Sequence, residues 1–423
     1  MKVLVVTQYF APEDSRIPTQ VAQQLAARGH EVRVLTAFPS YPAGKIFDGY
    51  SQKRGHFEFG PNGLVVQRVP TFISHSANPF GRITNYLSFA VSSALAWRPG
   101  ERPDVVYVYA TQMTASFGPF LWRLFFGVPY VLHVQDLWPE SVTRSALVRG
   151  GWIATAMERI MTPFLKGAYK KAAATIAIAP TMSKILVERG SPSDVTKTVL
   201  NWADESQPPA SRDDVDHVQM QASVSERGPA RRTAVVYAGN VGPLQDLEMV
   251  VAAASRLRAV PGFSLTIIGS GLSEPSVRRA VDSSGTRNIR LLNRVPKEQM
   301  AHVYQESDFQ LVPLKDLEIF RGTVPSKFTA ALAAGVPVIT NVAGDVTRLV
   351  AAHRLGLTAR PGDVHDLERV LREAHETAPE ERLAMASRCA DYYRAEMSMS
   401  AGVARIEEVI REAARVSSKE KDA

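Results

Sequence analysis

The chain has 423 residues, of which 45% are apolar and one is a cysteine, and it carries a formal net charge of +7. This length predicts two domains, each with its own core, and the single cysteine excludes a disulfide framework. Residues 1–200 carry 21 Lys and Arg against 12 Asp and Glu, whereas the rest carries 28 against 30. The basic half indicates an anionic partner, such as a phospholipid surface or a phosphorylated substrate. Because the chain has no dense basic stripe and no helix-turn-helix, zinc or RNA-binding motif, we expect no nucleic-acid partner.

The N-terminus and the apolar runs give no sign of a secretory signal or of a membrane span. Lys2 leads directly into the apolar residues 3–6, and Arg123 interrupts the longest apolar stretch, residues 117–132. A membrane-spanning helix would need about 20 consecutive apolar residues. The sequence therefore predicts a cytoplasmic protein, with peripheral contact to the inner face of an anionic cell membrane as a further expectation.

Apolar strands alternate with helices through the first 202 residues. Residues 2–7 form an apolar strand, residues 17–25 place apolar side chains at helical spacing, and residues 32–35 form the next strand. Such a βαβ unit favours a parallel pair of strands. Further strands are expected at residues 65–69, 105–109, 130–134 and 175–179. The pattern predicts an α/β domain over residues 1–202 with a doubly wound sheet, whose ligands lie beyond the carboxyl ends of the strands.

Residues 133–140, HVQDLWPE, follow one of these buried strands. A histidine, two carboxylates and a tryptophan at a strand end are able to bind a sugar and to move protons. The alternative is that Trp138 packs in the core while Asp136 or Glu140 caps the next helix. Both interpretations stay open at this point.

Two apolar segments of the first domain have unusual surroundings. Residues 152–171 mix apolar side chains with Arg159, Lys166 and Lys170, which predicts a basic amphipathic helix. Such a helix lies either on an anionic bilayer or on its own sheet. Residues 79–97 add aromatic and apolar side chains that suit an entrance for an apolar substrate.

A linker and a second alternating series complete the chain. Residues 203–232 are polar and nearly free of large apolar side chains, which predicts a linker. Its Asp214 and Asp216 form a D-x-D pair, but a solvated loop is the favoured interpretation and we assign no metal. Residues 233–396 predict a second doubly wound domain, with strands at residues 233–238, 265–269, 289–295, 309–314 and 336–341. The final helix, residues 397–418, has an apolar stripe that needs a partner surface.

Three loops of the second domain combine glycine with phosphate-binding chemistry. Glycine lets the backbone approach a ligand and leaves its N–H groups free. Residues 322–345 predict a loop, a helix with Ser326 as N-cap and Lys327 in its first turn, and then a buried strand; the bland alternative is one more αβ unit. The sequence therefore predicts a nucleotide-diphosphate cradle formed by Gly239, Asn240, Gly242, Gly269, Ser270, Gly271 and the region 321–327.

Six segments in order resemble one enzyme family. They are QYFAPE at residues 8–13, RGHEV at 28–32, FPSYP at 38–42, DLWPES at 136–141, GNVG at 239–242 and VPSK at 324–327. On these segments the chain resembles the retaining glycosyltransferases of family 4, which have the GT-B fold. Within that family it is similar to the bacterial enzymes of surface polysaccharide synthesis of the WbuB and colanic-acid type.

The resemblance implies two Rossmann-like domains facing a cleft, with the acceptor on the first domain, a nucleotide-sugar on the second, and helix 397–418 packed back on the first. It implies transfer of a hexose or N-acetylated amino sugar, from a UDP-linked donor, to a lipid-linked or small-molecule acceptor, without metal or other cofactor. The implied residues are Asp136, Lys327 and His133 in catalysis; Gly239, Asn240, Gly242, Gly269, Ser270, Gly271, Arg294, Val295, Arg321 and Ser326 for the donor; and Tyr9, Phe10, Arg16 and Tyr41 for the acceptor.

The chain departs from the wider family at several positions. Two glutamates that touch the donor sugar and the ribose correspond here to Gly322 and Ala330, and an Arg and a Lys that bind diphosphate correspond to Asn240 and Gln245. The alternatives are therefore a nucleotide-sugar-binding or scaffold subunit without catalysis, or a GT-B enzyme with an atypical donor.

Overall fold

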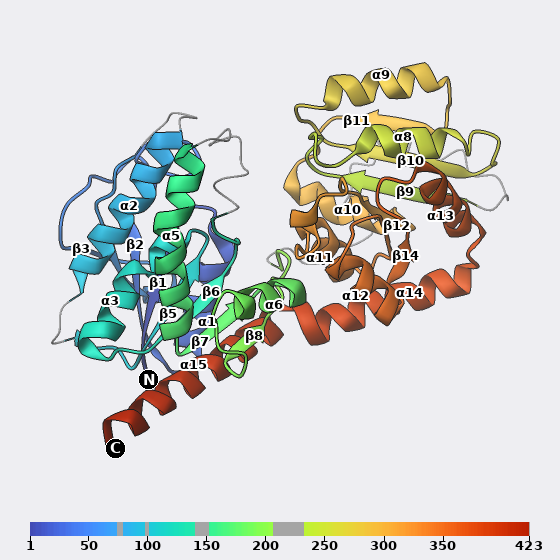
Figure 1. Cartoon of the computed structure of the whole chain (residues 1–423). Helices are drawn as coiled ribbons and strands as arrows, with labels where there is room; N and C mark the ends of the chain where they lie inside the picture. The colour runs from blue at the N-terminus through green and yellow to red at the C-terminus, as the bar shows by residue number, and fades with distance from the viewer. Residues whose placement is uncertain (74–78, 98–100, 140–151, 206–231, 423) are drawn as a thin grey trace. The chain divides into compact units, whose positions relative to one another are not determined.

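The computed structural model describes residues 1–73, 79–97, 101–139, 152–205 and 232–422. The chain divides into two compact units, one formed by Met1–Leu200 with Gly402–Ala423 and the other by Asn201–Ala401 (Figure 1). Residues 206–231 of the predicted linker, which include Asp214 and Asp216, lie outside the described residues. No helix in the described part of the chain is both long and apolar enough to cross a membrane.

The first unit is built on an eight-stranded sheet in the order β3-β4-β2-β1-β5-β6-β7-β8. All neighbours are parallel except the edge strand β3, which runs antiparallel to β4. Because β1 lies between β2 and β5, the chain reverses its direction of winding there, and ligands of such sheets bind at that point. The strands are β1 (Lys2–Val6), β2 (Glu31–Ala37), β3 (His56–Phe59), β4 (Val65–Val69), β5 (Val105–Ala110), β6 (Tyr130–Val134), β7 (Ala174–Ala177) and β8 (Thr196–Thr198).

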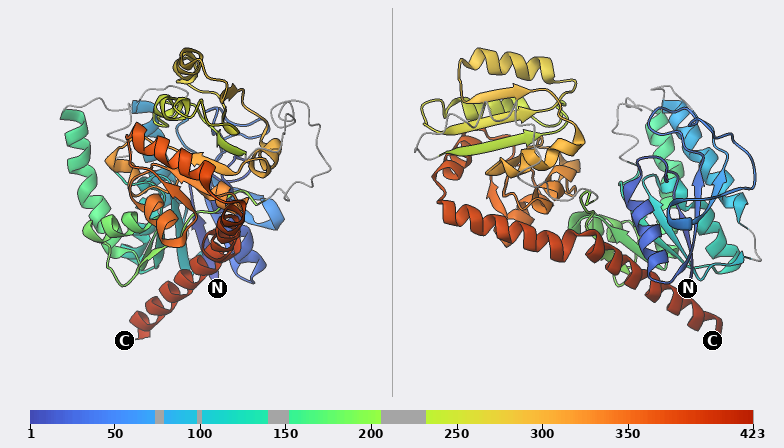
Figure 2. Two further views of the ribbon diagram at one scale, coloured as in Figure 1. Left: turned by 90° about the vertical axis from the view of Figure 1, so that its right-hand side faces the viewer. Right: turned by 180° about the vertical axis from the view of Figure 1, so that it is seen from behind.

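Helices cover both faces of this sheet. The helices α2, α3 and α5 lie on the face turned to the viewer in Figure 1, and α1 lies on the face seen from behind in Figure 2. This double cover explains why β5 consists only of buried residues. The helices of this unit are α1 (Arg16–Ala27), α2 (Pro79–Ala96), α3 (Phe117–Phe126), α5 (Trp152–Lys171) and α6 (Pro180–Glu188), with 3₁₀ turns η1 (Pro61–Gly63) and η3 (Met113–Ser116).

The last helix, α15 (Met399–Asp422), belongs to the first unit from Gly402 onward. Its apolar stripe is buried there, at Val403, Ile406, Val409 and Ile410. Glu407 on the same helix accepts hydrogen bonds from Arg28, at 2.9 Å, and from Arg411. The His30 Nε2 atom lies 2.9 Å from the same carboxylate. A charged cluster therefore attaches the end of the chain to the loop that follows α1.

The second unit is built on a six-stranded sheet in the order β11-β10-β9-β12-β13-β14, and every pair in it is parallel. Its winding reverses between β9 and β12. The strands are β9 (Thr233–Ala238), β10 (Phe263–Ile268), β11 (Ile289–Leu292), β12 (Phe309–Val312), β13 (Val338–Thr340) and β14 (Gly356–Thr358).

The helices α8, α9 and α13 of the second unit enclose the main apolar cluster on one face of the sheet, and α10 packs on the other face. The helices are α8 (Leu247–Ser255), α9 (Glu274–Ser284), α10 (Met300–Gln305), α11 (Ser326–Ala333), α12 (Asp345–His353), α13 (Val364–Glu376) and α14 (Pro379–Tyr392), with 3₁₀ turns η4 (Lys297–Gln299) and η5 (Glu318–Phe320) and the π-helical turn η6 (Tyr393–Met397). Every strand expected from the sequence is present, and the short strands β3, β8 and β14 were not expected.

The Glu407 cluster generates a pH-dependent prediction. Burial alone would raise the pKa of Glu407, but hydrogen bonds from Arg28, His30 and Arg411 outweigh it and lower the pKa from 4.5 to about 2. A carboxylate with a lowered pKa stabilises the fold above its unfolded-state pKa and loses that effect as the pH falls towards the folded value. We expect Glu407→Gln to lower the free energy of unfolding by about 1–2 kcal/mol at neutral pH, a figure reduced for solvent screening.

Urea unfolding followed by tryptophan fluorescence at pH 7 and at pH 3 measures this difference, which should shrink at the lower pH. The neighbouring Glu408 is exposed, so Glu408→Gln serves as the control and should change little. An equal loss for Glu407→Gln at both pH values would contradict the assignment.

Candidate functional site

The loops after β9 and β10 touch each other backbone to backbone. A Cβ atom on Gly269 would lie 1.8 Å from the carbonyl oxygen of Gly239, and one on Gly271 would lie 2.4 Å from that of Val241. Both glycines also have positive φ angles, of 152° and 157°, which side-chain-bearing residues rarely adopt. Glycine is therefore required at both positions, and residues 239–242 and 269–271 form one continuous surface at the carboxyl edge of the sheet.

The first turn of α11 lies against the same surface. A Cβ atom on Gly239 would lie 2.2 Å from Lys327 Cε, so the lysine side chain occupies the space that a side chain at position 239 would fill. The Lys327 Nζ atom lies 5.3 Å from the centre of the Tyr237 ring, and the Tyr237 hydroxyl donates to the carbonyl oxygen of Asn240. We call residues 239–242, 269–271 and 325–327 together the glycine surface.

Lys327 brings a positive charge to the glycine surface. Burial lowers the pKa of Lys327, because the charged form loses hydration, and the described residues contain no carboxylate or other acceptor bonded to its Nζ atom. The N-terminus of α11 adds free backbone N–H groups beside it. Pro325 is the N-cap of α11 and Ser326 is its first residue, so the expected N-cap role of Ser326 is wrong. A half-buried cation at a helix start suits an anion.

The remaining predicted donor residues differ in exposure. Asn240, Ser270, Arg294 and Arg321 are exposed, whereas Val295 packs beside a small apolar cluster.

Two hydrogen bonds hold the loops of the glycine surface. The Gly242 N–H donates to Gln245 Oε1 at 3.1 Å, so the glutamine closes the first loop on itself. The carbonyl oxygen of Arg321 accepts from the Asp345 N–H at 2.9 Å, which ties the 321–327 loop to the loop after β13. Sequence reasoning missed Tyr237, because an aromatic residue inside a buried strand carries no local signal of a ligand site.

The carboxyl edge of the first sheet carries a chain of amides at its reversal point. Gln8 follows β1 and Gln112 follows β5, and both are buried. Gln112 Nε2 donates to Gln8 Oε1, and Gln8 Nε2 donates to Asn85 Oδ1 on α2. We call residues 8–13, 40–41, 111–112 and 135–138 the polar edge.

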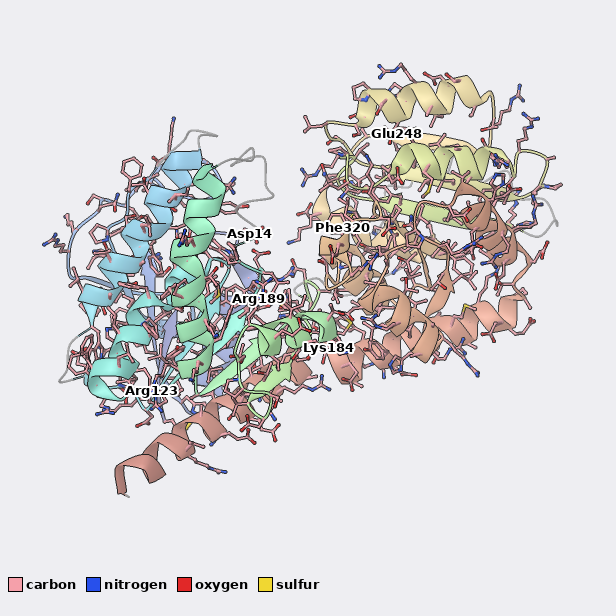
Figure 3. All side chains as sticks on the ribbon, viewed as in Figure 1. Asp14, Arg123, Lys184, Arg189, Glu248 and Phe320 are labelled. Carbon is pink, nitrogen blue, oxygen red and sulfur yellow. The ribbon has the colours of Figure 1, made fainter. Side chains whose placement is uncertain are left out.

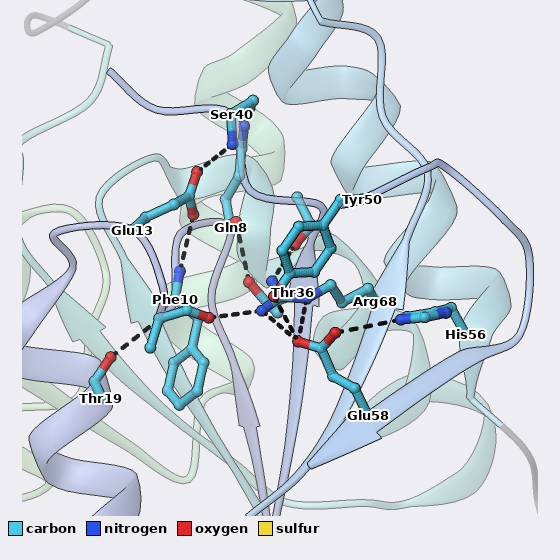
Figure 4. A network of polar contacts seen from close by, with 12 residues as sticks. Gln8, Phe10, Glu13, Thr19, Thr36, Ser40, Tyr50, His56, Glu58 and Arg68 are labelled. Carbon is cyan, nitrogen blue, oxygen red and sulfur yellow. Dashed lines mark hydrogen bonds and ion pairs between the residues drawn. The ribbon is translucent and has the colours of Figure 1, made fainter. Parts of the chain in front are cut away.

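Glu13 shapes the polar edge from inside. Its carboxylate accepts from the N–H groups of Phe10 at 3.2 Å and Ser40 at 2.7 Å (Figure 4). It also accepts from the N–H group of Tyr41 at 2.8 Å. Burial raises the pKa of Glu13, although these three hydrogen bonds act in the opposite direction. One buried carboxylate therefore fixes the loop after β1 against the loop after β2.

The buried guanidinium of Arg68 on β4 also fixes the loop after β1, and it ties this loop to the end of β2. It donates to the carbonyl oxygens of Ala37, at 2.9 Å, and Ala11, at 2.6 Å. It also donates to Glu58 Oε1 at 2.6 Å and lies 5.2 Å from the centre of the Tyr50 ring. Figure 4 shows these contacts beside those of Glu13. Neither Arg68 nor Glu13 was assigned a role from the sequence, because their partners are distant along the chain.

The structure separates the predicted acceptor residues. Tyr9 and Tyr41 lie together at the polar edge, with ring centres 5.3 Å apart and Tyr41 half exposed. Burial raises the pKa of Tyr109, and Arg16, which begins α1, lies close enough for its charge to oppose that rise. Phe10 is fully buried, so the expected acceptor contact by its side chain is not supported and it belongs to the core.

The two catalytic residues predicted in the first unit, His133 and Asp136, differ in exposure. His133 is fully buried in β6, where its Nδ1 atom lies 2.6 Å from the Tyr107 hydroxyl and burial lowers its pKa to about 3. It is therefore a neutral core residue, and the expected catalytic role is not supported. Asp136 reaches the surface at the polar edge, and partial burial raises its pKa. Its charge adds to the rise in the pKa of Tyr109 that burial causes.

Trp138 follows the alternative interpretation and packs in the core. Its ring lies 5.6 Å from that of Tyr86, nearly edge to face, and its carbonyl oxygen accepts from Arg189 at 2.6 Å. Glu140 lies outside the described residues. Across the described ranges, no three His, Cys, Asp or Glu side chains gather where they could hold a metal ion.

Two family models match the two units in turn. A glycosyl transferase 4-like domain matches residues 15–202, and a glycosyl transferases group 1 domain matches residues 232–376. The chain belongs to the family 4 glycosyltransferases. This glycosyltransferase is 28% identical over 348 residues to WcaI of Escherichia coli strain K12, named as a glycosyl transferase of colanic acid biosynthesis, covering 79% of this chain and 82% of the relative. WbjE of Pseudomonas aeruginosa, named as a glycosyltransferase, is 24% identical over 60% of this chain and 61% of its own.

Solved structures show the GT-B fold. HepE of Anabaena, crystallised with UDP, superposes with a TM-score of 0.62 and 14% identity, covering 97% of this chain and all of the other. WaaG, described as a glycosyltransferase involved in lipopolysaccharide biosynthesis, superposes with a TM-score of 0.60 and 16% identity, covering 97% and 99% of the two chains. The two doubly wound units of this glycosyltransferase are therefore the two halves of a GT-B enzyme fold.

The contact between Gly269 and Gly239 generates a prediction about stability. We expect Gly269→Ala to lower the free energy of unfolding by about 2–4 kcal/mol, because the new Cβ atom strikes a carbonyl oxygen and the φ angle suits glycine alone. Gly285→Ala is the matched control: it also has a positive φ, of 59°, but a Cβ atom there meets nothing within 4 Å. It should cost only about 1 kcal/mol. Equal losses in urea unfolding would show that the two loops do not touch.

Proposed function

We propose that this glycosyltransferase moves a hexose or an N-acetylated amino sugar from a nucleoside diphosphate, with UDP as the favoured nucleotide, to a lipid-linked or small-molecule acceptor. The setting that we propose is surface polysaccharide synthesis in the cytoplasm. Support comes from WcaI, which is named for colanic acid biosynthesis, and from HepE, whose crystals contain UDP and UDP-glucose. The single observation that carries the donor assignment is the half-buried ammonium of Lys327, which lies beside the glycine surface and has no bonded acceptor within the described ranges.

The role of these groups follows from the negative charge that develops on the departing diphosphate during transfer. Cleavage of the bond between sugar and diphosphate leaves negative charge on the departing diphosphate, and fixed positive groups lower the energy of that transition state. Lys327 supplies a full charge, and the start of α11 supplies oriented N–H groups. We propose that these groups stabilise the leaving group without a metal or other cofactor, and that transfer retains the anomeric configuration.

The acceptor is assigned to the polar edge of the first unit. Asp136 is the carboxylate that reaches the surface there, and the raised pKa that burial gives it suits hydrogen bonding to sugar hydroxyl groups. The buried amide chain of Gln8, Gln112 and Asn85 holds the loops of the polar edge in place behind it. Tyr9 and Tyr41 add aromatic faces.

A second candidate function is nucleotide-sugar binding without transfer, or transfer from an atypical donor. Gly322 is buried and Ala330 is half-buried on α11, so neither position offers a carboxylate to a ribose or a donor sugar. Lys327 and the glycine surface are the same in both candidates. Transfer by the purified protein from a panel of nucleotide-sugars to a polyprenyl-diphosphate sugar distinguishes them, because the binding subunit alone would give no product.

Replacement of the lysine is the direct test of the donor site. Lys327→Met keeps the aliphatic chain against Gly239 and Tyr237 but removes the charge. Because a hydrogen bond to a charged group is worth about 1.5–3 kcal/mol, we expect roughly a tenfold to hundredfold loss of affinity for UDP in calorimetry. Arg258→Met removes an exposed charge from the same unit and is the control. Unchanged UDP affinity in Lys327→Met, or no UDP binding by the wild type, would overturn the donor assignment.

A further inference from the structure

Tyr237 is a core residue whose polar end reaches the glycine surface. It is fully buried near the carboxyl end of β9, in the apolar cluster enclosed by α8, α9 and α13. Its hydroxyl donates to the carbonyl oxygen of Asn240 in the loop that follows the strand. Burial raises the pKa of Tyr237, so the hydroxyl stays protonated at neutral pH and acts as a donor. A phenylalanine would fill the same space in the core, so the hydroxyl needs a reason outside it.

The hydroxyl fixes the orientation of the peptide unit between Asn240 and Val241. The C=O and N–H groups of a trans peptide point in opposite directions. With the carbonyl turned to Tyr237, the Val241 N–H points the other way and donates to the carbonyl oxygen of Ser270 at 3.0 Å. The Tyr237 hydroxyl thus stabilises the contact between the loops after β9 and β10. It also holds the Asn240 carbonyl oxygen against the core, where its negative end does not face an anionic ligand.

The Tyr237 ring faces the ammonium of Lys327. The Nζ atom lies 5.3 Å from the ring centre, and cations within about 6 Å of an aromatic face are attracted to it. The lysine stem is fixed as well, because its Cε atom lies 2.2 Å from the place that a Cβ atom on Gly239 would take. A lysine side chain is otherwise flexible along its four carbons. The ring and the gap at Gly239 therefore hold the charge in one place before any ligand binds.

Tyr237 connects the two sides of the point where the sheet reverses its winding. Figure 3 labels Glu248 in the first turn of α8 and Phe320 in η5. The loops that lead to these two residues follow β9 and β12, the strands between which the winding reverses. Ligands of doubly wound sheets bind between such loops. Tyr237 bonds to the loop after β9 and contacts Lys327, which lies beyond the loop after β12.

We infer that Tyr237 is a positioning residue for the donor diphosphate. Its ring holds the Lys327 ammonium at the glycine surface, and its hydroxyl keeps the Asn240 carbonyl away from the same anion. Groups that are fixed before binding lose little conformational entropy when the ligand arrives, so both contacts raise the affinity for the donor. The inference rests on the proposed function, because it concerns the donor site assigned there. Tyr237 acts through Lys327 and Asn240 and touches none of the reacting atoms.

A purely structural role is the alternative, and Phe263 provides the matched control. Phe263 is a buried aromatic residue of the same apolar cluster, but it begins β10 and pairs with Thr233 at the opposite end of β9. Replacement of either aromatic residue by leucine leaves a cavity and should lower the free energy of unfolding. We expect Phe263→Leu to bind UDP as the wild type does, whereas Tyr237→Leu should not.

Calorimetry with UDP separates the ring from the hydroxyl. Tyr237→Phe removes only the hydroxyl and should lower the affinity for UDP by about threefold to tenfold, with or without the charge of Lys327. Unchanged affinity in Tyr237→Phe would overturn the role of the hydroxyl.

The effect of the ring is the difference between Tyr237→Leu and Tyr237→Phe, since both variants lack the hydroxyl. In the protein that keeps Lys327, we expect the leucine variant to bind UDP about threefold to tenfold more weakly than the phenylalanine variant. With Lys327→Met added to both, the difference should fall below about twofold, because the ring then has no cation to hold. A structural ring would give the same difference in both backgrounds, and that result would overturn the inference.

The position of the ammonium is measurable without any ligand, which separates this inference from the proposed function. Nuclei above an aromatic face are shielded, so in protein with isotope-labelled lysine the Lys327 Cε proton signal should lie upfield of the other lysines. Lys327→Met assigns the signal, which should stay upfield in Tyr237→Phe and move back in Tyr237→Leu. Absence of the shift from the wild type would overturn the inference even if UDP binds. A wild type that shows the shift but binds no UDP would support the placement of the ammonium and overturn the donor assignment instead.

Discussion

The ammonium of Lys327, half-buried against the Tyr237 ring and without an acidic partner among the described residues, is the constraint on which the second unit depends. Its position requires the absence of a side chain at Gly239, and the Gly239 loop in turn requires the absence of one at Gly269. A buried cation without a counter-charge costs free energy unless a ligand supplies the anion. The Lys327 ammonium therefore offers a positive charge to an anionic ligand at the point where the sheet reverses its winding.

In the first unit, by contrast, the buried charges have partners. It also buries charges near the reversal point of its sheet, but Glu13 is satisfied by three backbone N–H groups, and Arg68 by two carbonyl oxygens and Glu58. The charges of Glu13 and Arg68 hold loops in place. The side chains of the polar edge itself are amides, aromatic rings and Asp136. A cationic edge in one unit and a mostly neutral one in the other agree with the diphosphate donor and the hydroxyl-bearing acceptor that we propose.

The sequence predicted those features that depend on neighbouring residues. Strands buried on both faces are uniformly apolar, and glycines at their carboxyl ends marked the glycine surface, so both were found. His133 and Phe10 were misassigned because exposure depends on which way a side chain points at the end of a strand, and a uniformly apolar strand hides that alternation. Tyr237, Glu13 and Arg68 went unassigned because their contacts join loops that are distant in sequence or lie inside a strand.

The helix α2 shows the same limit of sequence-based prediction. Apolar spacing in a sequence identifies the buried stripe of a helix only when the opposite stripe is polar. In α2 both stripes are apolar or neutral, so residues 79–97 suggested an entrance for an apolar substrate without indicating which side chains are exposed. The packing of Gly118 on Ala94 and the exposure of Leu95 decide that. The same helix carries Asn85 to the amide chain of the polar edge, so exposed apolar side chains and a residue of that amide chain share one rigid element.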